Sequence, residues 1–464
     1  MTRKDTYYFL GIGGIGMSAL ARYLAAKGYR VLGYDRTPSS LTHQLEEEGI
    51  SVQYDDSIEQ LQSLDIQRTI VVRTPAIPEG FVLLEWFRQH QFQIVKRAEL
   101  LGELTRSACT LSVAGTHGKT TTSTILAHIL HQSHIGSNAI LGGIACNYGS
   151  NLLLDSSDNF VVEADEFDRS FHQLMPYISV ITSMDADHLD VYGTEQAYCE
   201  SFEKFAAQVQ HALVLKRGLH LRNCQDISAT IYTYDVFATS CSSVDLPHFY
   251  ADNIRVTNAE IYFDFHTPTH AIANVQLGVP VWVNVENAVA AMSVAYLMGV
   301  SDDELRNAVA TFTGVHRRFN IHLNTPQVAY VDDYAHHPME LQACIHSVRM
   351  LYPERYVLGV FQPHLFTRTR DFADDFAQVL SSLDEVTLLP IYPAREEPIE
   401  GITSEWLLRK VNTMRALLYS PTMLPKFLHE RVKRLLAVGK DCVVVTMGAG
   451  DIDRYTNEII TKLL

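Results

Sequence analysis

The sequence has 464 residues, of which 47% are hydrophobic and 19% charged, and its formal net charge is −16 at pH 7. Because this length exceeds what one hydrophobic core usually serves, we expect two to four domains and predict three. The negative charge disfavours non-specific binding to nucleic acid or to an anionic membrane. No uninterrupted apolar run reaches the roughly 18 residues that a membrane span needs, so we expect no membrane partner.

Two further features predict a cytoplasmic protein. The first six residues lead directly into an apolar strand, without a hydrophobic signal region or a small-residue cleavage site. The seven cysteines are odd in number, scattered and never spaced as C-x-x-C. We therefore expect reduced packing cysteines rather than a disulfide framework or a zinc site.

The first segment carries a glycine-rich fingerprint. An apolar strand over 7–10 is followed by the turn Gly11-Ile12-Gly13-Gly14-Ile15-Gly16. A helix over 17–27 and a strand that leads to Asp35 complete a βαβ unit of the dinucleotide-binding type. The glycines allow a tight turn, a close approach of the backbone to a diphosphate, and close packing of the helix. We predict a diphosphate site here, with purely structural glycines as the alternative.

A second loop lies at the same predicted sheet edge. It follows a strand over 70–72, and ligands of open α/β sheets bind at such edges. Thr74 is therefore a candidate substrate contact. A simple turn before Pro75 explains the same residue equally well.

The segment 110–122 reads as a strand, a phosphate-binding loop and the start of a helix. Its centre is Gly115-Thr116-His117-Gly118-Lys119-Thr120-Thr121. Backbone N–H groups of such a loop surround an anion, Lys119 can reach the outer phosphates, and the Thr120 hydroxyl can ligate Mg²⁺. Only two residues separate the glycines, where the usual P-loop has four, so this loop is a shorter variety.

Acidic residues and a histidine follow two further strands of the second domain. A strand over 160–162 leads into Glu163-Ala164-Asp165-Glu166, and one over 178–182 leads toward Asp187-His188. We expect both ends to face the same sheet edge as the phosphate loop. Because Mg²⁺ bridges phosphates and prefers hard oxygen ligands, these positions suit a metal.

The remaining elements are predicted from periodicity and helix-ending signals. Residues 217–280 read as a small antiparallel excursion, and helices are expected over 287–298 and 302–311. A third domain begins near residue 316, with strands over 328–331, 356–361, 386–389 and 442–446. Polar clusters at 332–338, 362–370, 392–397 and 448–451 follow these strands, which predicts a second doubly wound sheet with a site at one edge.

The predicted fold class is therefore α/β with three domains. We expect an N-terminal Rossmann-like domain, a central P-loop ATPase-type domain with a mixed sheet, and a C-terminal Rossmann-like domain. The predicted boundaries are 1–106, 107–315 and 316–464.

The motifs taken together resemble the ATP-dependent Mur ligases of bacterial peptidoglycan synthesis. The resemblance covers almost the whole chain. It is carried by the runs 11–18, 115–120, 163–166, Asp187-His188, Arg317-Arg318-Phe319, Asp332-Asp333-Tyr334-Ala335-His336-His337-Pro338 and 396–399. The family has one domain for a UDP-sugar, one for ATP and one for the incoming amino acid, which agrees with the division above.

The resemblance implies a reaction that joins L-alanine to the lactyl carboxylate of UDP-N-acetylmuramate, through an acyl phosphate and with cleavage of ATP to ADP and phosphate. It implies ATP and two Mg²⁺ ions as cofactors, with Mn²⁺ as a substitute. It also implies cytoplasmic peptidoglycan precursor synthesis by a monomer or weak homodimer, with closure of the domains gating turnover.

The resemblance also assigns site residues. The ATP-binding residues are Gly115, Thr116, Gly118, Lys119, Thr120, Thr121, Asn284, Asn287, Arg318 and Asp333. The UDP-sugar-binding residues are Gly11, Gly13, Gly14, Ile15, Gly16, Asp35, Thr74 and His117. The metal ligands are Thr120, Glu163 and His188. The catalytic residues are Lys119, His188, Arg318, His336 and His337, and the amino acid is assigned to His364, Arg368 and Arg370. The chain departs from the common family pattern at Val283, Leu365 and Arg395.

Three other functions stay open. A recycling ligase that attaches a whole tripeptide to the same UDP-sugar shares the ATP machinery. An NAD-dependent dehydrogenase fits the first glycine motif but gives Lys119, Glu163 and His188 no task. A non-catalytic nucleotide sensor leaves the histidines and arginines of the third domain unexplained.

Overall fold

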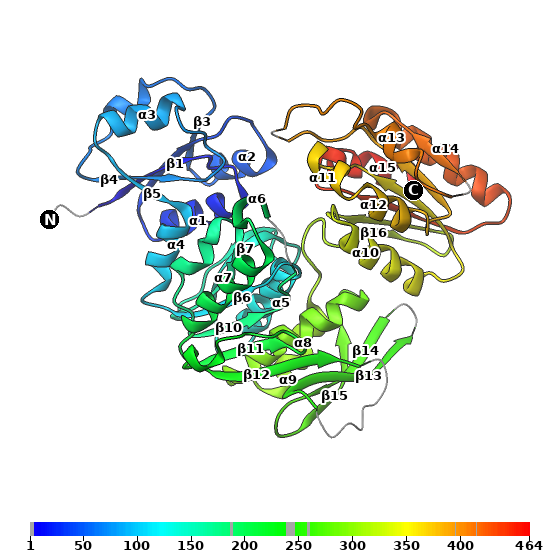
Figure 1. The fold of residues 1–464 in the computed structure, drawn as a ribbon, viewed down its shortest axis with the longest axis horizontal. Coiled ribbons are helices and arrows are strands. Elements are labelled where there is room, and N and C mark those ends of the chain that lie inside the picture. Colours follow the sequence, from blue (N-terminus) through cyan, green and yellow to red (C-terminus); the bar gives the residue numbers. More distant parts are fainter. Residues whose placement is uncertain (1–3, 186–188, 238–245, 258–259, 395, 414) are drawn as a thin grey trace. The chain divides into compact units, whose positions relative to one another are not determined.

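The computed structural model describes residues 4–185, 189–237, 246–257, 260–394, 396–413 and 415–464, and their strands form three sheets (Figure 1). The contacts divide the chain into two compact units. One comprises Met1–Ile254, Tyr262–Gly278 and Val285–Thr313, and the other comprises Arg255–Ile261, Val279–Asn284 and Gly314–Leu464. The three sheets agree with the expected α/β class, and the boundaries at 106/107 and 315/316 stay predictions.

The first sheet is parallel throughout, with strand order β3-β2-β1-β4-β5. All five residues of β1 are buried, as expected for a parallel strand that is covered on both faces. The strands are β1 (Thr6–Leu10), β2 (Arg30–Tyr34), β3 (Ser51–Gln53), β4 (Thr69–Arg73) and β5 (Gln93–Lys96). The helices are α1 (Ile15–Ala26), α2 (Ser40–Glu47), α3 (Val82–Gln89) and α4 (Arg97–Thr105), with a 3₁₀ turn η1 (Gln60–Ser63).

The second sheet is mixed and has the order β15-β14-β13-β12-β11-β10-β6-β9-β7-β8. Its strands are β6 (Cys109–Ala114), β7 (Asn138–Ala145), β8 (Ser150–Leu153), β9 (Asn159–Ala164), β10 (Ile178–Ile181), β11 (Ala212–Lys216), β12 (Thr230–Val236), β13 (Phe249–Thr257), β14 (Glu260–His266) and β15 (Ala271–Leu277). Its helices are α5 (Lys119–Gln132), α6 (Leu189–Tyr192), α7 (Glu195–Ala207), α8 (Trp282–Leu297) and α9 (Asp302–Thr311), with 3₁₀ segments η2 (Phe167–Gln173) and η3 (Cys224–Asp226).

The third sheet has the order β16-β17-β21-β18-β19-β20. Its strands are β16 (Asn320–Asn324), β17 (Val328–Asp333), β18 (Tyr356–Phe361), β19 (Glu385–Leu388), β20 (Ala416–Leu418) and β21 (Cys442–Met447). Its helices are α10 (Pro338–Leu351), α11 (Phe366–Asp371), α12 (Ala373–Leu380), α13 (Ser404–Leu408), α14 (Leu424–Ala437) and α15 (Thr456–Leu463), with 3₁₀ turns η4 (Pro421–Met423) and η5 (Asp451–Tyr455).

Three sequence-based details are corrected. The segment 217–280, predicted as an antiparallel excursion, joins the sheet through β12, which pairs in parallel with β11 on one side and with β13 on the other. Helix α8 begins at Trp282, five residues before the predicted start. The third sheet also has an antiparallel edge strand, β16, which pairs with β17 and was not expected. Only Leu323 of β16 is buried, so the strand lacks the apolar run that would have revealed it.

The first two sheets share one hydrophobic core. Helix α1 packs on β7 and β8 of the second sheet, and α4 packs on η2. Arg22 of α1 is 7% exposed and donates to Asn151 Oδ1 at 2.6 Å, while Asn151 Nδ2 donates to Ile15 O at 2.6 Å. These buried hydrogen bonds fix the glycine-rich end of α1 against the central sheet.

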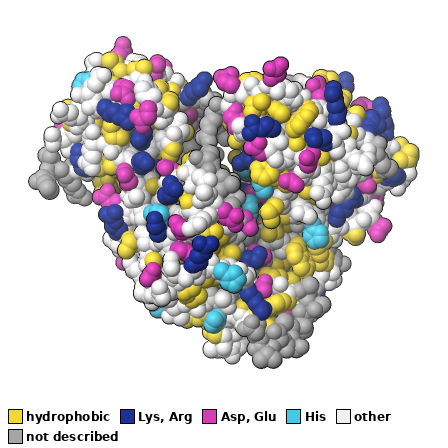
Figure 2. Space-filling view, viewed as in Figure 1, with side chains coloured by type: hydrophobic (Ala, Val, Ile, Leu, Met, Phe, Trp, Pro, Cys, Tyr) yellow, Lys and Arg dark blue, Asp and Glu magenta, His cyan; other side chains and the backbone are white. Residues whose placement is uncertain are grey.

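Two surface properties bear on partners. Among the described residues, no helix combines the length and the apolar character needed to cross a membrane. Figure 2 shows acidic and basic side chains mixed over the face in view rather than gathered into one basic patch.

A buried histidine in α5 links the pH to the stability of the fold. His128 is 2% exposed, and its ring nitrogens lie 2.7 Å from Tyr148 Oη and 3.1 Å from Thr311 Oγ1. Burial lowers the pKa of His128 to about 4, so the unfolded chain, with an ordinary histidine pKa, binds more protons at mildly acidic pH. The contribution of neutral His128 to the free energy of unfolding is complete above about pH 6.5 and is lost as the pH falls toward 4.

We therefore expect a histidine-dependent loss of unfolding free energy between pH 7 and pH 4, with an upper limit of about 3 kcal/mol. Urea unfolding at several pH values measures it. The variant His128→Gln, which does not titrate, should show a correspondingly flatter pH dependence. An identical pH dependence in both proteins would contradict the assignment to His128.

Candidate active site

The phosphate-binding loop connects β6 to α5 and has the predicted form. Gly115 has φ +135°, and a Cβ there would collide with Thr182 Oγ1. Gly118 has φ +82°, and a Cβ there would lie 2.8 Å from Asn287 Oδ1. Side chains are therefore excluded at both glycines, by backbone conformation and by space.

The loop is fastened to the segment that follows β10. His117 N donates to Ser183 Oγ at 2.9 Å, and Thr116 Oγ1 donates to Asp185 O at 2.7 Å. Thr182 Oγ1 donates to Ala114 O at 3.2 Å. The loop is thus positioned by the strand end that leads toward Asp187 and His188. These last two residues lie outside the described part of the chain.

Lys119 is bound to a buried carboxylate. Its Nζ lies 2.9 Å from Glu166 Oε1 and 2.8 Å from Oε2, and it also donates to Gly115 O at 2.6 Å and Thr116 O at 3.3 Å. Burial raises the pKa of Glu166, against the opposing effect of the Lys119 ammonium. Burial alone would lower the pKa of Lys119, but the Glu166 carboxylate outweighs it and raises that pKa.

Glu163 lies beside the same helix end. It pairs with Val113 across β6 and β9, and its Oε1 accepts from Gly142 N at 2.9 Å and from Ser123 Oγ at 3.3 Å. Ser123 also donates to Thr120 O at 3.1 Å, which ties Glu163 to the first turn of α5. Glu163 thus lies beside the first turn of α5, which also contains the other predicted metal ligand, Thr120.

Asn287 also reaches this loop. It is 6% exposed and accepts from Thr122 Oγ1 at 3.1 Å. Asn284 lies three residues earlier on α8 and is buried to the same degree. Thr120 and Thr121, in the first turn of α5, are half-buried.

The glycine-rich fingerprint precedes α1, as expected. Asp35 Oδ2 accepts from Gly13 N at 2.8 Å, so the acid holds the loop in addition to any ligand role. Gly11 has φ +86°, and a Cβ there would lie 2.8 Å from Thr74 Cγ2, which places Thr74 against the fingerprint. Thr74 O also accepts from Ile77 N at 3.2 Å, so the turn that sequence offered as the other explanation is present.

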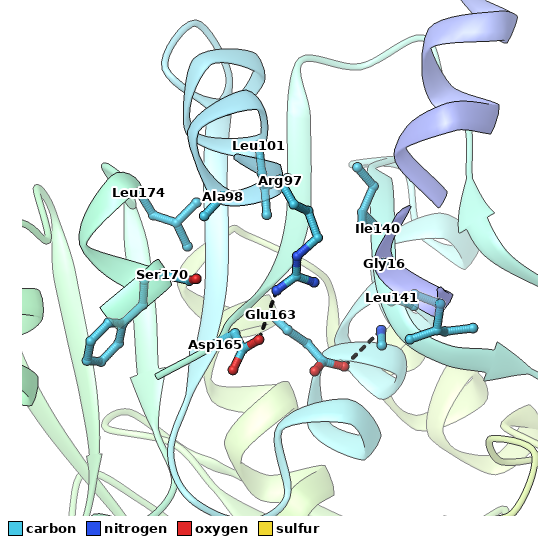
Figure 3. A pocket seen from close by; sticks show the side chains of 13 residues that line it. Gly16, Arg97, Ala98, Leu101, Ile140, Leu141, Glu163, Asp165, Ser170 and Leu174 are labelled. Carbon is cyan, nitrogen blue, oxygen red and sulfur yellow. Dashed lines mark hydrogen bonds and ion pairs between the residues drawn. The ribbon is translucent and has the colours of Figure 1, made fainter. Parts of the chain in front are cut away.

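A cavity of about 160 Å³ lies between this fingerprint and Glu163 (Figure 3). Gly16, Arg97, Glu163 and Asp165 contribute to its lining, and Arg97 Nη2 lies 2.9 Å from Asp165 Oδ2. Figure 3 shows the Arg97 side chain pointing from α4 toward the two acids. Sequence reasoning missed Arg97, because it belongs to no recognisable motif.

The second unit holds the predicted amino-acid residues. His336 and His364 have ring centroids 6.0 Å apart, and the ring of His364 stacks on Tyr392 at 5.8 Å. His336 Nδ1 lies 3.3 Å from Glu340 Oε2, and burial lowers its pKa, which favours the neutral ring near pH 7. His337 caps α10 and packs on Phe372 at 4.8 Å.

The two predicted arginines of this site differ. Arg368 is half-buried, and its charge contributes to the lowered pKa of His336. Arg370 is exposed, and its Nε donates to Asp371 Oδ1 at 2.7 Å. The structure thus relates Arg368 more directly to the histidines. Leu365, the N-cap residue of α11, has φ +69°, and Arg395 lies outside the described residues.

Arg318 and Asp333 lie together at the end of β17. Asp333 accepts from Phe319 N at 2.8 Å and Ala335 N at 2.7 Å, and burial raises its pKa to about 7 against the opposing charge of Arg318. The guanidinium of Arg318 lies 5.2 Å from the ring centroid of Tyr334. Arg318 and Asp333, which were predicted to act together, therefore lie in one local cluster, in which Arg318 also makes a cation–π contact with Tyr334.

Comparison with known proteins identifies the family. Residues 6–108 match the Mur ligase family catalytic domain, 113–295 the Mur ligase middle domain, and 317–450 the Mur ligase glutamate ligase domain. A UDP-N-acetylmuramate–L-alanine ligase of Parabacteroides distasonis is 52% identical, with 99% of this chain and 97% of that protein covered. One of Flavobacterium psychrophilum is 46% identical, covering 98% and 97%. The chain belongs to the Mur ligase family.

Solved structures agree on the fold. The crystal structure of UDP-N-acetylmuramate-alanine ligase MurC from Thermotoga maritima superposes with a TM-score of 0.80 at 24% identity, covering 98% of each chain. A murein peptide ligase from Psychrobacter arcticus gives a TM-score of 0.71 at 22% identity, covering 99% of this chain and 98% of that one. The predicted three-domain α/β class is confirmed.

Proposed function

We propose that this chain is an ATP-dependent ligase that joins L-alanine to the lactyl carboxylate of UDP-N-acetylmuramate. The relatives at 46–52% identity over nearly the full length carry the name of that activity. The observation that carries the proposal is the strand edge that gathers the phosphate loop, Lys119 and Glu163. Since the chain belongs to a ligase family, the dehydrogenase alternative is dropped.

The donor set at this edge fits a divalent cation. The Thr120 hydroxyl and the Glu163 carboxylate are hard oxygen donors of the kind that Mg²⁺ takes together with phosphate oxygens. No group of three or more acidic, histidine or cysteine side chains that could hold a metal occurs in the described ranges. We propose Thr120 and Glu163 as ligands, with His188 as a third from outside these ranges. A bound cation would neutralise phosphate charge.

In the first step the substrate carboxylate oxygen bonds to the γ-phosphorus of ATP while the bond to the leaving ADP oxygen breaks. Such a transfer needs positioning and charge neutralisation rather than covalent help from the protein. The Lys119 ammonium is proposed to hold the β- and γ-phosphates, and the loop amides from Gly115 to Gly118 to surround them. Asn284, Asn287, Arg318 and Asp333 remain proposed nucleotide contacts.

In the second step the amine of alanine attacks the acyl phosphate, an amide forms, and phosphate leaves. His336 is the favoured proton acceptor, since its lowered pKa keeps the ring neutral. His364, Arg368 and Arg370 are the proposed contacts of the alanine, the arginines for its carboxylate. His337 stays the second candidate base. The glycine motif, Asp35, Thr74 and His117 are proposed for the UDP-sugar.

The decisive experiment supplies the purified chain with ATP, Mg²⁺ and UDP-N-acetylmuramate, and measures phosphate release and product mass with L-alanine, L-serine, glycine or tripeptide. We expect L-alanine to give the fastest release and the product heavier by one alanyl residue. Turnover with tripeptide alone would replace this function by that of the recycling ligase. We further propose a cytoplasmic monomer or weak homodimer, which light scattering after gel filtration tests for oligomeric state.

A further inference from the structure

Glu166 is a buried carboxylate for which the proposed chemistry has no use. Its side chain is 2% exposed, whereas that of Lys119 is 16% exposed. The two Glu166 oxygens lie 2.9 and 2.8 Å from Lys119 Nζ. Lys119 is the cation proposed to hold the nucleotide phosphates, so the carboxylate contacts the group on which phosphate binding depends.

The ammonium of Lys119 has no donor to spare. It carries three N–H groups, and its acceptors are the Glu166 carboxylate and the carbonyls of Gly115 and Thr116, at 2.6 and 3.3 Å. A phosphate oxygen that binds Lys119 must therefore displace one of these acceptors or share with it. Glu166 is the charged acceptor among them, so its hold on the ammonium is the strongest.

The backbone at Glu166 is held in place by several hydrogen bonds. Glu166 O accepts from Arg169 N at 2.9 Å and from the Tyr192 hydroxyl, and Asp165 O accepts from Phe171 N at 2.9 Å. The turn between them is tight, with φ values of +54° at Asp168 and +55° at Arg169. These bonds fix the backbone from which the Glu166 side chain reaches Lys119 Nζ.

We propose that Glu166 is a positioning residue that keeps Lys119 folded over the phosphate loop and competes with nucleotide phosphates for its ammonium. The inference rests on the nucleotide site of the proposed function and not on the identity of the sugar or amino acid. Glu166 lowers ground-state affinity for the nucleotide, and it keeps Lys119 ordered at the loop between turnovers.

The test is Glu166→Gln, which keeps the shape and the hydrogen-bonding oxygen but removes the charge. We expect the full-length variant to bind Mg-ADP about tenfold more tightly than wild type by calorimetry. The KM for ATP should fall and kcat should not rise, because the gain is uniform binding. A merely structural role would give unchanged or weaker binding, and that result in a folded variant overturns the proposal.

Two further variants make the test specific. Asp168→Asn removes one charge from the same turn, and Asp168 lies near Lys96 rather than Lys119, at 3.7 Å. Because Asn tolerates a positive φ, this control should fold and bind Mg-ADP within about twofold of wild type. In a Lys119→Met background, Glu166→Gln should no longer tighten binding, and equal tightening there would show that Glu166 does not act through Lys119.

If Glu166→Gln does not fold, Glu166→Asp replaces it, because the shorter side chain withdraws the charge from Nζ. Tighter Mg-ADP binding is again expected, and its absence overturns the proposal. If the wild-type protein binds Mg-ADP but does not join L-alanine to UDP-N-acetylmuramate, the proposed function is refuted instead. The two failures are therefore distinguishable.

Discussion

The variant Lys119→Ala is expected to lower kcat at least about 10³-fold in the phosphate-release assay. The ammonium is the proposed partner of the β- and γ-phosphates, where negative charge is concentrated in the transition state. Wild-type Lys119 already lies over the loop, since it bonds to Gly115 O at 2.6 Å. Alanine leaves that position without a charge, so the loss should appear mainly in kcat.

The same change affects the fold, because it leaves Glu166 buried without its cation. Breaking a buried pair on one side costs about 3–5 kcal/mol, reduced here to the extent that the carboxyl group becomes protonated. The double variant Lys119→Met with Glu166→Gln should recover much of this stability in thermal unfolding and none of the activity. Near-normal turnover by folded Lys119→Ala would contradict the mechanism. Recovered activity in the double variant would show that Lys119→Ala loses activity only because the protein is destabilised.

The sequence predicted the edge on which this chemistry depends. The carboxyl ends of parallel strands meet at one edge, so the phosphate loop after β6 and the acid Glu163 at the end of β9 could be placed together without coordinates. The positions of the strands and of the phosphate loop follow from short stretches of sequence, through the periodicity of the strands and the spacing of the glycines. The fingerprint before α1 was predictable for the same reason.

Contacts between distant segments could not be predicted. The Lys119–Glu166 pair joins residues 47 positions apart, and Arg97 reaches Asp165 across 68 positions. The run from Glu163 to Glu166 was visible as a group of acids, but sequence alone does not say which oxygen faces a cation. The edge strand β16 was not predicted because only one of its residues, Leu323, is buried, and the strand therefore lacks an apolar run.

The variant Glu163→Gln is expected to raise the Mg²⁺ concentration needed for half-maximal activity by about tenfold or more, and to lower kcat/KM about 10²-fold at limiting Mg²⁺. Gln keeps an oxygen that can accept from Gly142 N and from Ser123 Oγ, the bonds that Glu163 Oε1 makes at 2.9 and 3.3 Å. The shape of the strand edge should therefore survive. What is lost is the negative charge, which makes a carboxylate a stronger ligand for a divalent cation than a neutral amide oxygen.

The measurement is phosphate release titrated with Mg²⁺ and, separately, with Mn²⁺. Excess metal should restore part of the activity of Glu163→Gln, because weakened binding is compensated by mass action. Ser123→Ala is the matched control, since it removes the longer of the two hydrogen bonds and no charge. It should change the Mg²⁺ requirement less than about threefold. If Glu163→Gln kept the wild-type metal requirement, Glu163 would not be a ligand, and its bonds to Gly142 and Ser123 would have to be explained as support for the phosphate-binding helix alone.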